Sequence, residues 1–225
     1  MTLKYFGHSA FQIVTDSGLS IFIDPFISEN PLSACGIEGL KADYILLTHA
    51  HADHLGDTLS LAHKKETTIV CVYELAGLLE KAGYKTHAMQ IGGAFSFPFG
   101  RVKFTQALHG SQTPDGVYAG LAAGIILELE GATLYHAGDT GLFGDLDLIG
   151  DLNDIDYFLV PIGGNFTMDI QDAAIATSWI NPKYAIPMHY NTFPVIKANP
   201  QEFQALVEED GIKVLILKPG ETIKL

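Results

Sequence analysis

Histidines and an aspartate gather in one short segment of the sequence, His49-Ala50-His51-Ala52-Asp53-His54. Three imidazoles and one carboxylate are the mixture of nitrogen and oxygen donors that zinc-class metals accept. The side chains at positions 49 and 51 could chelate one ion, and those at 53 and 54 could reach a second ion after the chain turns. A solvated polar loop is the alternative, but this spacing is rare by chance. The segment therefore predicts a metal site.

Two metal ions need more donors than this segment supplies, and the sequence offers three further candidates. His109, Asp139 and His189 each follow an apolar or alternating run that predicts a strand. Taken singly, each has an ordinary alternative: a core or surface histidine, or an aspartate that caps a turn. Their common position at strand ends, where functional side chains often collect, favours metal ligation when they are considered together with the first segment.

The elements that must position these donors alternate between strands and helices. We expect strands at 3–6, 10–15, 19–24, 42–48, 68–72, 101–108, 119–130, 132–135, 157–161, 184–188 and 212–217, and helices at 57–65, 73–82, 169–180 and 200–209. Since no linker, charge run or low-complexity segment interrupts the pattern, one α+β domain over residues 1–225 is the simplest interpretation.

Three of the expected strands share a register. Asp43-Tyr44, Asp156-Tyr157 and Lys183-Tyr184 each precede an apolar run, and two of the three runs end in histidine. This repetition indicates two similar halves whose strand ends converge on one edge.

The motifs together resemble the metallo-β-lactamase superfamily, and more closely its small cytoplasmic metal-dependent hydrolases. The resemblance spans nearly the whole chain and rests on Gly7-His8-Ser9, Ile23-Asp24-Pro25, Thr48 to His54, His109-Gly110-Ser111, Ala137 to Thr140, Pro161 to Asn165 with Thr167-Met168, and Pro187 to Tyr190. It implies a four-layer αββα sandwich with the metal site at one edge, between the two β-sheets.

The resemblance also implies a dinuclear ligand set. One metal would be bound by His49, His51 and His109, the other by Asp53, His54 and His189, and Asp139 would bridge both. Two such ions, about 3.5–4 Å apart, generate hydroxide near neutral pH. In the family's pattern Asp53 orients this water or takes its proton. We therefore expect a hydrolase with two divalent ions, drawn from zinc, manganese, nickel and iron, with zinc or manganese favoured.

Four further residues have two interpretations each. His8 either contacts the substrate or protonates its leaving group, or is a hydrogen-bonded structural histidine. Asp24 either holds the second nitrogen of a ligand histidine or makes a strand-end turn. Gly164 and Asn165 either line the site or form a plain turn. The helix expected at 169–180 begins nearby, and its N-terminus would favour an anionic group.

Composition limits the partners. The 13 basic and 26 acidic side chains give a formal charge of -13, which opposes extended nucleic acid. No apolar stretch approaches the roughly 20 residues of a membrane span, and the N-terminus lacks a signal-peptide pattern, so we expect a soluble cytoplasmic protein without a membrane partner. A homo-oligomer is compatible with the sequence.

A small anionic substrate, such as a phosphodiester or a lactone-like metabolite, is favoured on these grounds. Two alternatives stay open. One is an iron-dependent redox or sulfur-chemistry enzyme on the same fold, and the other is a non-catalytic metal-binding module.

Overall fold

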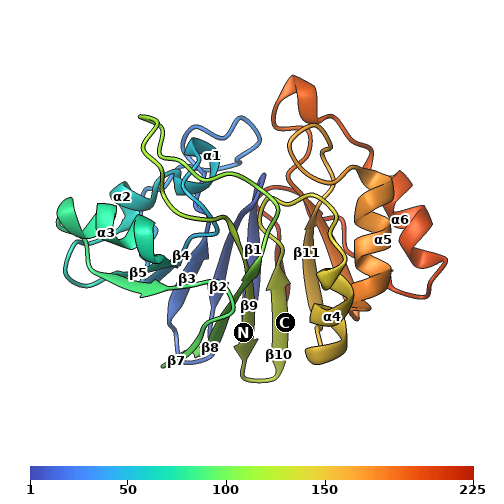
Figure 1. Cartoon of the computed structure of the whole chain (residues 1–225), viewed down its shortest axis with the longest axis horizontal. Coiled ribbons are helices and arrows are strands. Elements are labelled where there is room, and N and C mark those ends of the chain that lie inside the picture. Colours follow the sequence, from blue (N-terminus) through green and yellow to red (C-terminus); the bar gives the residue numbers. More distant parts are fainter.

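Two seven-stranded sheets lie between two layers of helices in the computed structural model, which describes residues 1–225 (Figure 1). The first sheet contains, in spatial order, β14 (Thr222–Lys224), β1 (Thr2–Gly7), β2 (Ala10–Val14), β3 (Ser20–Ile23), β4 (Tyr44–Leu46), β5 (Thr68–Val72) and β6 (Thr86–Met89). The second contains β13 (Lys213–Val214), β12 (Tyr184–Met188), β11 (Tyr157–Pro161), β10 (Ala132–His136), β9 (Ala123–Leu129), β8 (Gly100–Gln106) and β7 (Ala94–Phe97). The expected αββα sandwich is confirmed.

Helices cover the outer side of each sheet (Figure 1). Beside the first sheet lie α1 (Ala52–Leu55), α2 (Thr58–Leu61) and α3 (Tyr73–Lys81), and beside the second lie α4 (Asp145–Leu152), α5 (Ile170–Ile180) and α6 (Pro200–Glu208). A 3-10 helix, η1 (Pro194–Ile196), precedes α6. None of these helices is both long and apolar enough to cross a lipid bilayer.

Apolar strands hold the layers together. Strands β3 and β5 are buried along their whole length, as expected of runs that are covered on both faces. Phe11 from the first sheet and Phe104 from the second belong to one continuous core, whereas Phe158 and Phe203 belong to a second core that also contains residues of α4, α5 and α6. This packing fixes the sheets relative to each other, and with them the strand ends that carry the predicted donors.

Two aspartates directly precede equivalent strands in the two sheets. Asp43 Oδ2 accepts a hydrogen bond from Ser20 N at 2.8 Å, and the Asp43 amide donates to Ser20 O at 2.9 Å. Asp156 makes the same pair of bonds with Thr133, again at 2.8 and 2.9 Å. The register shared by these sequence segments therefore corresponds to strands β4 and β11, which occupy matching places in their sheets.

Helix positions differ from the sequence expectation at two points. The single helix expected at 57–65 is replaced by two short turns, α1 and α2, the first of which begins inside the metal-binding segment. Asp57 explains the break, because its carboxylate accepts hydrogen bonds from the backbone N–H groups of Ile27 and Ser28 at 2.8 Å each. Helix α4 was not expected, since its aspartates and Gly150 are weak helix formers and Leu146 is its one buried residue.

Candidate metal centre

The segment that carries most of the predicted donors runs from the end of β4 into α1. His49 and His54 are fully buried, while Asp53 is partly exposed. Gly56 ends α1 with a φ of 42°, and a β-carbon there would lie 2.5 Å from the carbonyl oxygen of Pro25. Only glycine lets α1 pack this closely against the end of β3, and this packing keeps the helix at the shared edge of the sheets.

Three histidines form the first group of donors. The Nε2 atom of His49 lies 3.0 Å from Nδ1 of His51, and Nε2 of His109 lies 3.3 Å from the same Nδ1. One ring nitrogen from each of the three residues lies within 4.8 Å of the others. This convergence of three nitrogens suits a tetrahedral metal that keeps one position open.

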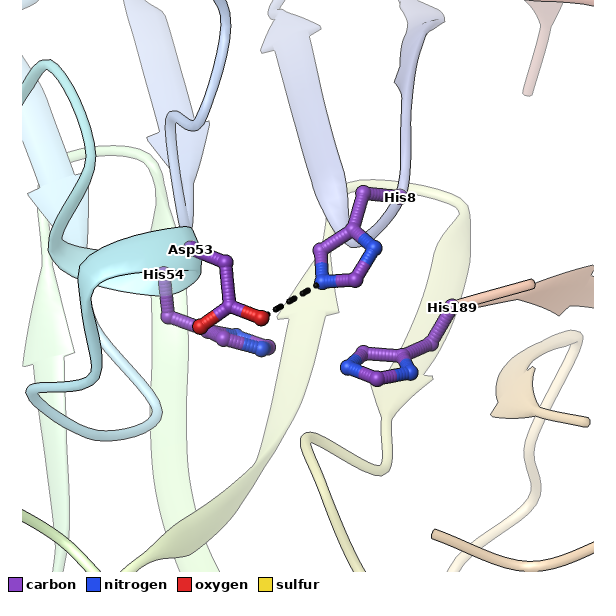
Figure 2. A group of neighbouring side chains, drawn as sticks. All are labelled: His8, Asp53, His54 and His189. Carbon is purple, nitrogen blue, oxygen red and sulfur yellow. Dashed lines mark hydrogen bonds and ion pairs between the residues drawn. The ribbon is translucent and has the colours of Figure 1, made fainter. Parts of the chain in front are cut away.

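The second group draws on three separate parts of the chain. Asp53 and His54 come from α1, His189 follows β12, and His8 lies in the turn between β1 and β2 (Figure 2). One donor atom from each of these four residues lies within 4.8 Å of the others. The structure thus brings together the residues expected at the second metal and adds His8 to them.

Asp139 lies between the two groups. Its Oδ1 is 3.2 Å from His54 Nε2, and its Oδ2 is 3.0 Å from His189 Nε2. The same Oδ2 is 3.6 Å from Nε2 of His109, which belongs to the first group. A single buried carboxylate therefore faces donors of both groups, the position required of a bridging ligand.

Several of these atoms have no hydrogen-bond partner within the protein. They are His54 Nε2, Asp139 Oδ1 and both ring nitrogens of His189, all of them buried. Unpaired buried polar atoms are costly and rare in folded proteins. His54 Nε2, Asp139 Oδ1 and His189 Nε2 lie close together and are all metal-ligand types, so a bound cation would account for these three, and the site fits the metals expected from the donor set.

Asp24 orients one of the ligands from behind. Its Oδ2 accepts a hydrogen bond from Nδ1 of His54 at 2.7 Å, which leaves Nε2 of that ring directed at Asp139. Thr48 fixes Asp24 in turn, donating from its backbone N–H at 2.8 Å and from its hydroxyl at 2.5 Å. Asp24 therefore has the geometry of a partner to a metal-binding imidazole, and its φ of 43° also makes a turn at the end of β3.

The pKa values of the donors follow from burial and charge. Burial lowers the pKa of His49, His51 and His109, so these rings are neutral near pH 7 and able to bind a cation. Burial also opposes the charged form of His54, but the carboxylates of Asp139 and Asp24 outweigh it and hold the pKa of His54 well above its usual value. The carboxylates thus already attract positive charge to the second group.

A cavity of about 200 Å³ opens onto these donors. It is lined by His51, Asp53, His109, Asp139, Phe166 and His189. Phe166 is 54% exposed and is the one apolar side chain among them. Access to the centre is therefore through a small opening lined by titratable side chains and one aromatic wall.

In the turn after β11, the residue that lines the cavity differs from the expected ones. Gly164 and Asn165 do not line the cavity and instead form the turn itself, with φ angles of 64° and 50° and a hydrogen bond from the Gly164 amide to Met168 O at 3.0 Å. Phe166, the next residue along, lines the cavity instead. No local sequence pattern indicates this role, because the placement of Phe166 depends on the left-handed turn before it.

The N-terminus of α5 is occupied by its own cap. Asp169 accepts a hydrogen bond from the Asp172 amide at 3.0 Å, which places a carboxylate where an anionic group was expected to bind. The expectation of an anion site at this helix is therefore wrong.

His8 also lies deeper than expected. Its side chain is fully buried, and burial lowers the pKa of His8 to about 4. Nε2 contacts Asp53 Oδ2 at 3.1 Å and Nδ1 contacts Thr192 Oγ1 at 2.9 Å. With both ring nitrogens engaged and no exposed surface, His8 is not placed to touch a substrate or protonate a leaving group, and Thr192 joins the site as a residue that the sequence did not indicate.

Comparisons with known proteins agree with this geometry. Residues 12–190 match the family described as the Beta-lactamase superfamily domain. The chain therefore belongs to this superfamily, which confirms the resemblance seen in the sequence. A relative from Anoxybacillus flavithermus, a UPF0173 metal-dependent hydrolase, is 51% identical over the full length of both chains, and one from Bacillus cereus is 49% identical over the same extent. Within the superfamily, the chain is a member of the UPF0173 metal-dependent hydrolases.

Solved structures carry the same fold. A metallo hydrolase from the hyperthermophilic archaeon Ignicoccus hospitalis superposes with a TM-score of 0.91 at 40% identity, over 99% of this chain and 97% of its own. An isothiocyanate hydrolase from Delia radicum gut bacteria superposes with a TM-score of 0.79 at 20% identity and shares the fold.

Proposed function

We propose that the chain hydrolyses a small anionic metabolite, such as a phosphodiester or a lactone-like compound, with two divalent metal ions bound at the candidate centre. The observation that carries this proposal is the position of Asp139, whose carboxylate faces His54, His109 and His189 at 3.0–3.6 Å. A structural metal site closes its own coordination, whereas these donors border an open cavity.

Seven side chains would hold the two ions. His49, His51 and His109 would hold one ion, Asp53, His54 and His189 the other, and Asp139 both. When bound, such a pair of ions lowers the pKa of water and supplies positive charge for a developing oxyanion. Asp53 lines the cavity, and its Oδ1 has no hydrogen-bond partner in the protein, so it can orient an attacking water or accept its proton.

Charge and space support the choice of substrate. With neutral histidines, the carboxylates of Asp24, Asp53 and Asp139 and two divalent ions sum to a formal charge of about +1, which favours an anionic group. The cavity of about 200 Å³ suits a small molecule. The formal charge of -13 on the whole chain repels an extended nucleic acid, and this local positive charge does not reverse it along a whole binding surface. Zinc and manganese remain the favoured ions, because the donors are imidazoles and carboxylates.

Metal analysis combined with hydrolysis assays tests the proposal. The protein is loaded separately with zinc, manganese, nickel or iron, its metal content is measured, and turnover of a model phosphodiester and a panel of lactones is followed. We expect two ions per chain and hydrolysis that Asp53→Ala abolishes, whereas His63→Ala, which changes an exposed histidine outside the site, leaves both unchanged.

Three results would reject the proposal. A single ion per chain in every metal, no hydrolysis of either class, or turnover unaffected by Asp53→Ala would each contradict it. Redox activity confined to the iron form would instead favour the iron-enzyme alternative.

A further inference from the structure

His8 lies where the two sheets meet and contacts every ligand of the second donor group (Figure 2). Its ring nitrogen Nε2 is 3.1 Å from Asp53 Oδ2. Its carbonyl oxygen accepts a hydrogen bond from the His189 amide at 2.8 Å, and the two rings pack with their centroids 4.0 Å apart. The His54 ring lies edge-on at 5.5 Å. One residue therefore links the β1–β2 turn, α1 and the end of β12.

The hydrogen-bond partners define the tautomer of His8. An ionised carboxylate can only accept hydrogen bonds, so Nε2 carries the hydrogen and donates it to Asp53. Nδ1 of the neutral ring is then an acceptor, and the Thr192 hydroxyl donates to it across 2.9 Å. The other acceptor within reach of that hydroxyl, the Tyr190 carbonyl oxygen, is farther away at 3.5 Å. The direction of donation thus runs from Thr192 to His8 to Asp53.

The backbone at His8 is under strain that its side chain explains. Its φ is 57°, in the left-handed region that favours glycine. The ring is fully buried in this conformation, packed against Phe26 and Phe193 at centroid distances of 5.7 and 5.5 Å. These aromatic contacts and the two hydrogen bonds leave the imidazole one orientation, so Asp53 meets a fixed donor.

We propose that His8 is the positioning residue of the second metal subsite, holding the Asp53 carboxylate in one orientation through its hydrogen bond to Oδ2. The Thr192 hydroxyl secures the tautomer of His8 that can do this. Since the subsite belongs to the metal centre proposed above, this role rests on the proposed function, but it concerns the affinity for the second ion rather than turnover.

The expected effect is confined to one of the two ions. Loss of an outer-shell partner of a metal ligand typically weakens binding 10–100-fold. His8→Phe removes both ring nitrogens and should weaken the second ion by about this factor, while the first ion, held by His49, His51 and His109, keeps its affinity. His8→Gln places an amide donor near the position of Nε2 and should recover most of the loss.

Stepwise titration with cobalt or zinc against a competing chelator measures the two affinities separately. Thr192→Val is the less disruptive variant, and it tests the proposal even if His8→Phe does not fold. It removes only the hydroxyl that sets the tautomer, and we expect a smaller loss, again at the second ion alone. Thr192→Ser retains the hydroxyl and His63→Phe alters an exposed histidine, so both should match the wild type.

The outcomes separate this role from the proposed function. If folded His8→Phe and Thr192→Val bind both ions as the wild type does, or lose both equally, or if His8→Gln recovers nothing, the positioning role is overturned. A wild type that binds one ion would defeat the dinuclear centre itself. A selective loss of the second ion in a protein without hydrolytic activity would support the role of His8 and reject the hydrolase.

Discussion

Replacing Asp24 by asparagine should impair metal binding without any change to a ligand. Asp24 is fully buried and accepts three hydrogen bonds, from the Thr48 amide at 2.8 Å, the Thr48 hydroxyl at 2.5 Å and His54 Nδ1 at 2.7 Å. Asparagine has the same shape but only one accepting atom. Its NH₂ group must therefore face one of these donors, either the Thr48 backbone or the His54 ring.

The effect passes to the metal through the tautomer of His54. If the NH₂ group faces Nδ1, the ring hydrogen moves to Nε2, the atom that is 3.2 Å from Asp139 and would bind the cation. If the amide flips, a buried N–H of Thr48 loses its acceptor. The metal-free protein can adopt the first arrangement, so binding of the cation must drive the flip, which costs about 1–3 kcal/mol. Since 1.4 kcal/mol is tenfold in affinity, we expect the second ion to bind roughly 10–100-fold more weakly.

Chelator competition gives the affinity, and nitrogen-15 NMR of labelled histidine in the metal-free protein reports the His54 tautomer. Asp43→Asn is the matched control, because Asp43 directly precedes a strand of the same sheet and accepts from Ser20 N without touching a metal donor. It should bind both ions normally. An Asp24→Asn protein with wild-type affinity for both ions would refute the reasoning, whichever tautomer His54 adopts.

Three further predictions, which use four substitutions, have defined outcomes. Phe166→Ala should raise KM about fivefold without changing metal content, because about 1 kcal/mol of apolar contact is lost from a side chain that is 54% exposed in the cavity wall; an unchanged KM for every substrate would exclude contact with it. Burial lowers the pKa of His136 below its ordinary 6.5, so the unfolded chain takes up the proton first and the metal-free protein should lose stability as the pH falls below that value. Urea unfolding at about pH 7.5 and about pH 5.5 measures this dependence, and His136→Gln should reduce it. Gly163→Ala should destabilise the fold by about 1–3 kcal/mol, since its β-carbon would lie 2.2 Å from the His189 carbonyl oxygen. Gly77→Ala, in an open position on α3, should stabilise it by about 0.5–1 kcal/mol in the same urea assay.

The sequence located the donors well because their positions depend on local patterns. His49 and His189 follow apolar runs, and parallel strands such as β11 and β12 end at a common edge, so the side chains that come after such strands meet there. The aspartate and histidines of one short segment needed only a turn to converge. The α+β class followed from the alternation of strands and helices, whereas the αββα sandwich followed from the resemblance to the superfamily.

The supporting residues could not be found in this way. Thr192 lies 184 positions from His8, and no local pattern links them. The burial of the His8 side chain and the position of Phe166 both depend on residues with left-handed backbone, which these residue types do not predict. The helix expected at 57–65 is shortened to α2 and preceded by the unexpected turn α1, because Asp57 binds backbone groups of another segment. Each of these features arises from tertiary contacts, which override local propensity.

The matching positions of β4 and β11 relate the two halves of the chain by an approximate twofold repeat. Tyr44 pairs with Ile21 as Tyr157 pairs with Leu134, so residues can be counted from the two tyrosines. Counted in this way, residues 49–54 are equivalent to residues 162–167. Asp53 and Phe166 are then equivalent positions, because each lies nine residues after its tyrosine. Both side chains line the same cavity. One copy of this loop thus carries four of the candidate metal donors, and the equivalent loop of the other copy carries the aromatic wall of the same cavity.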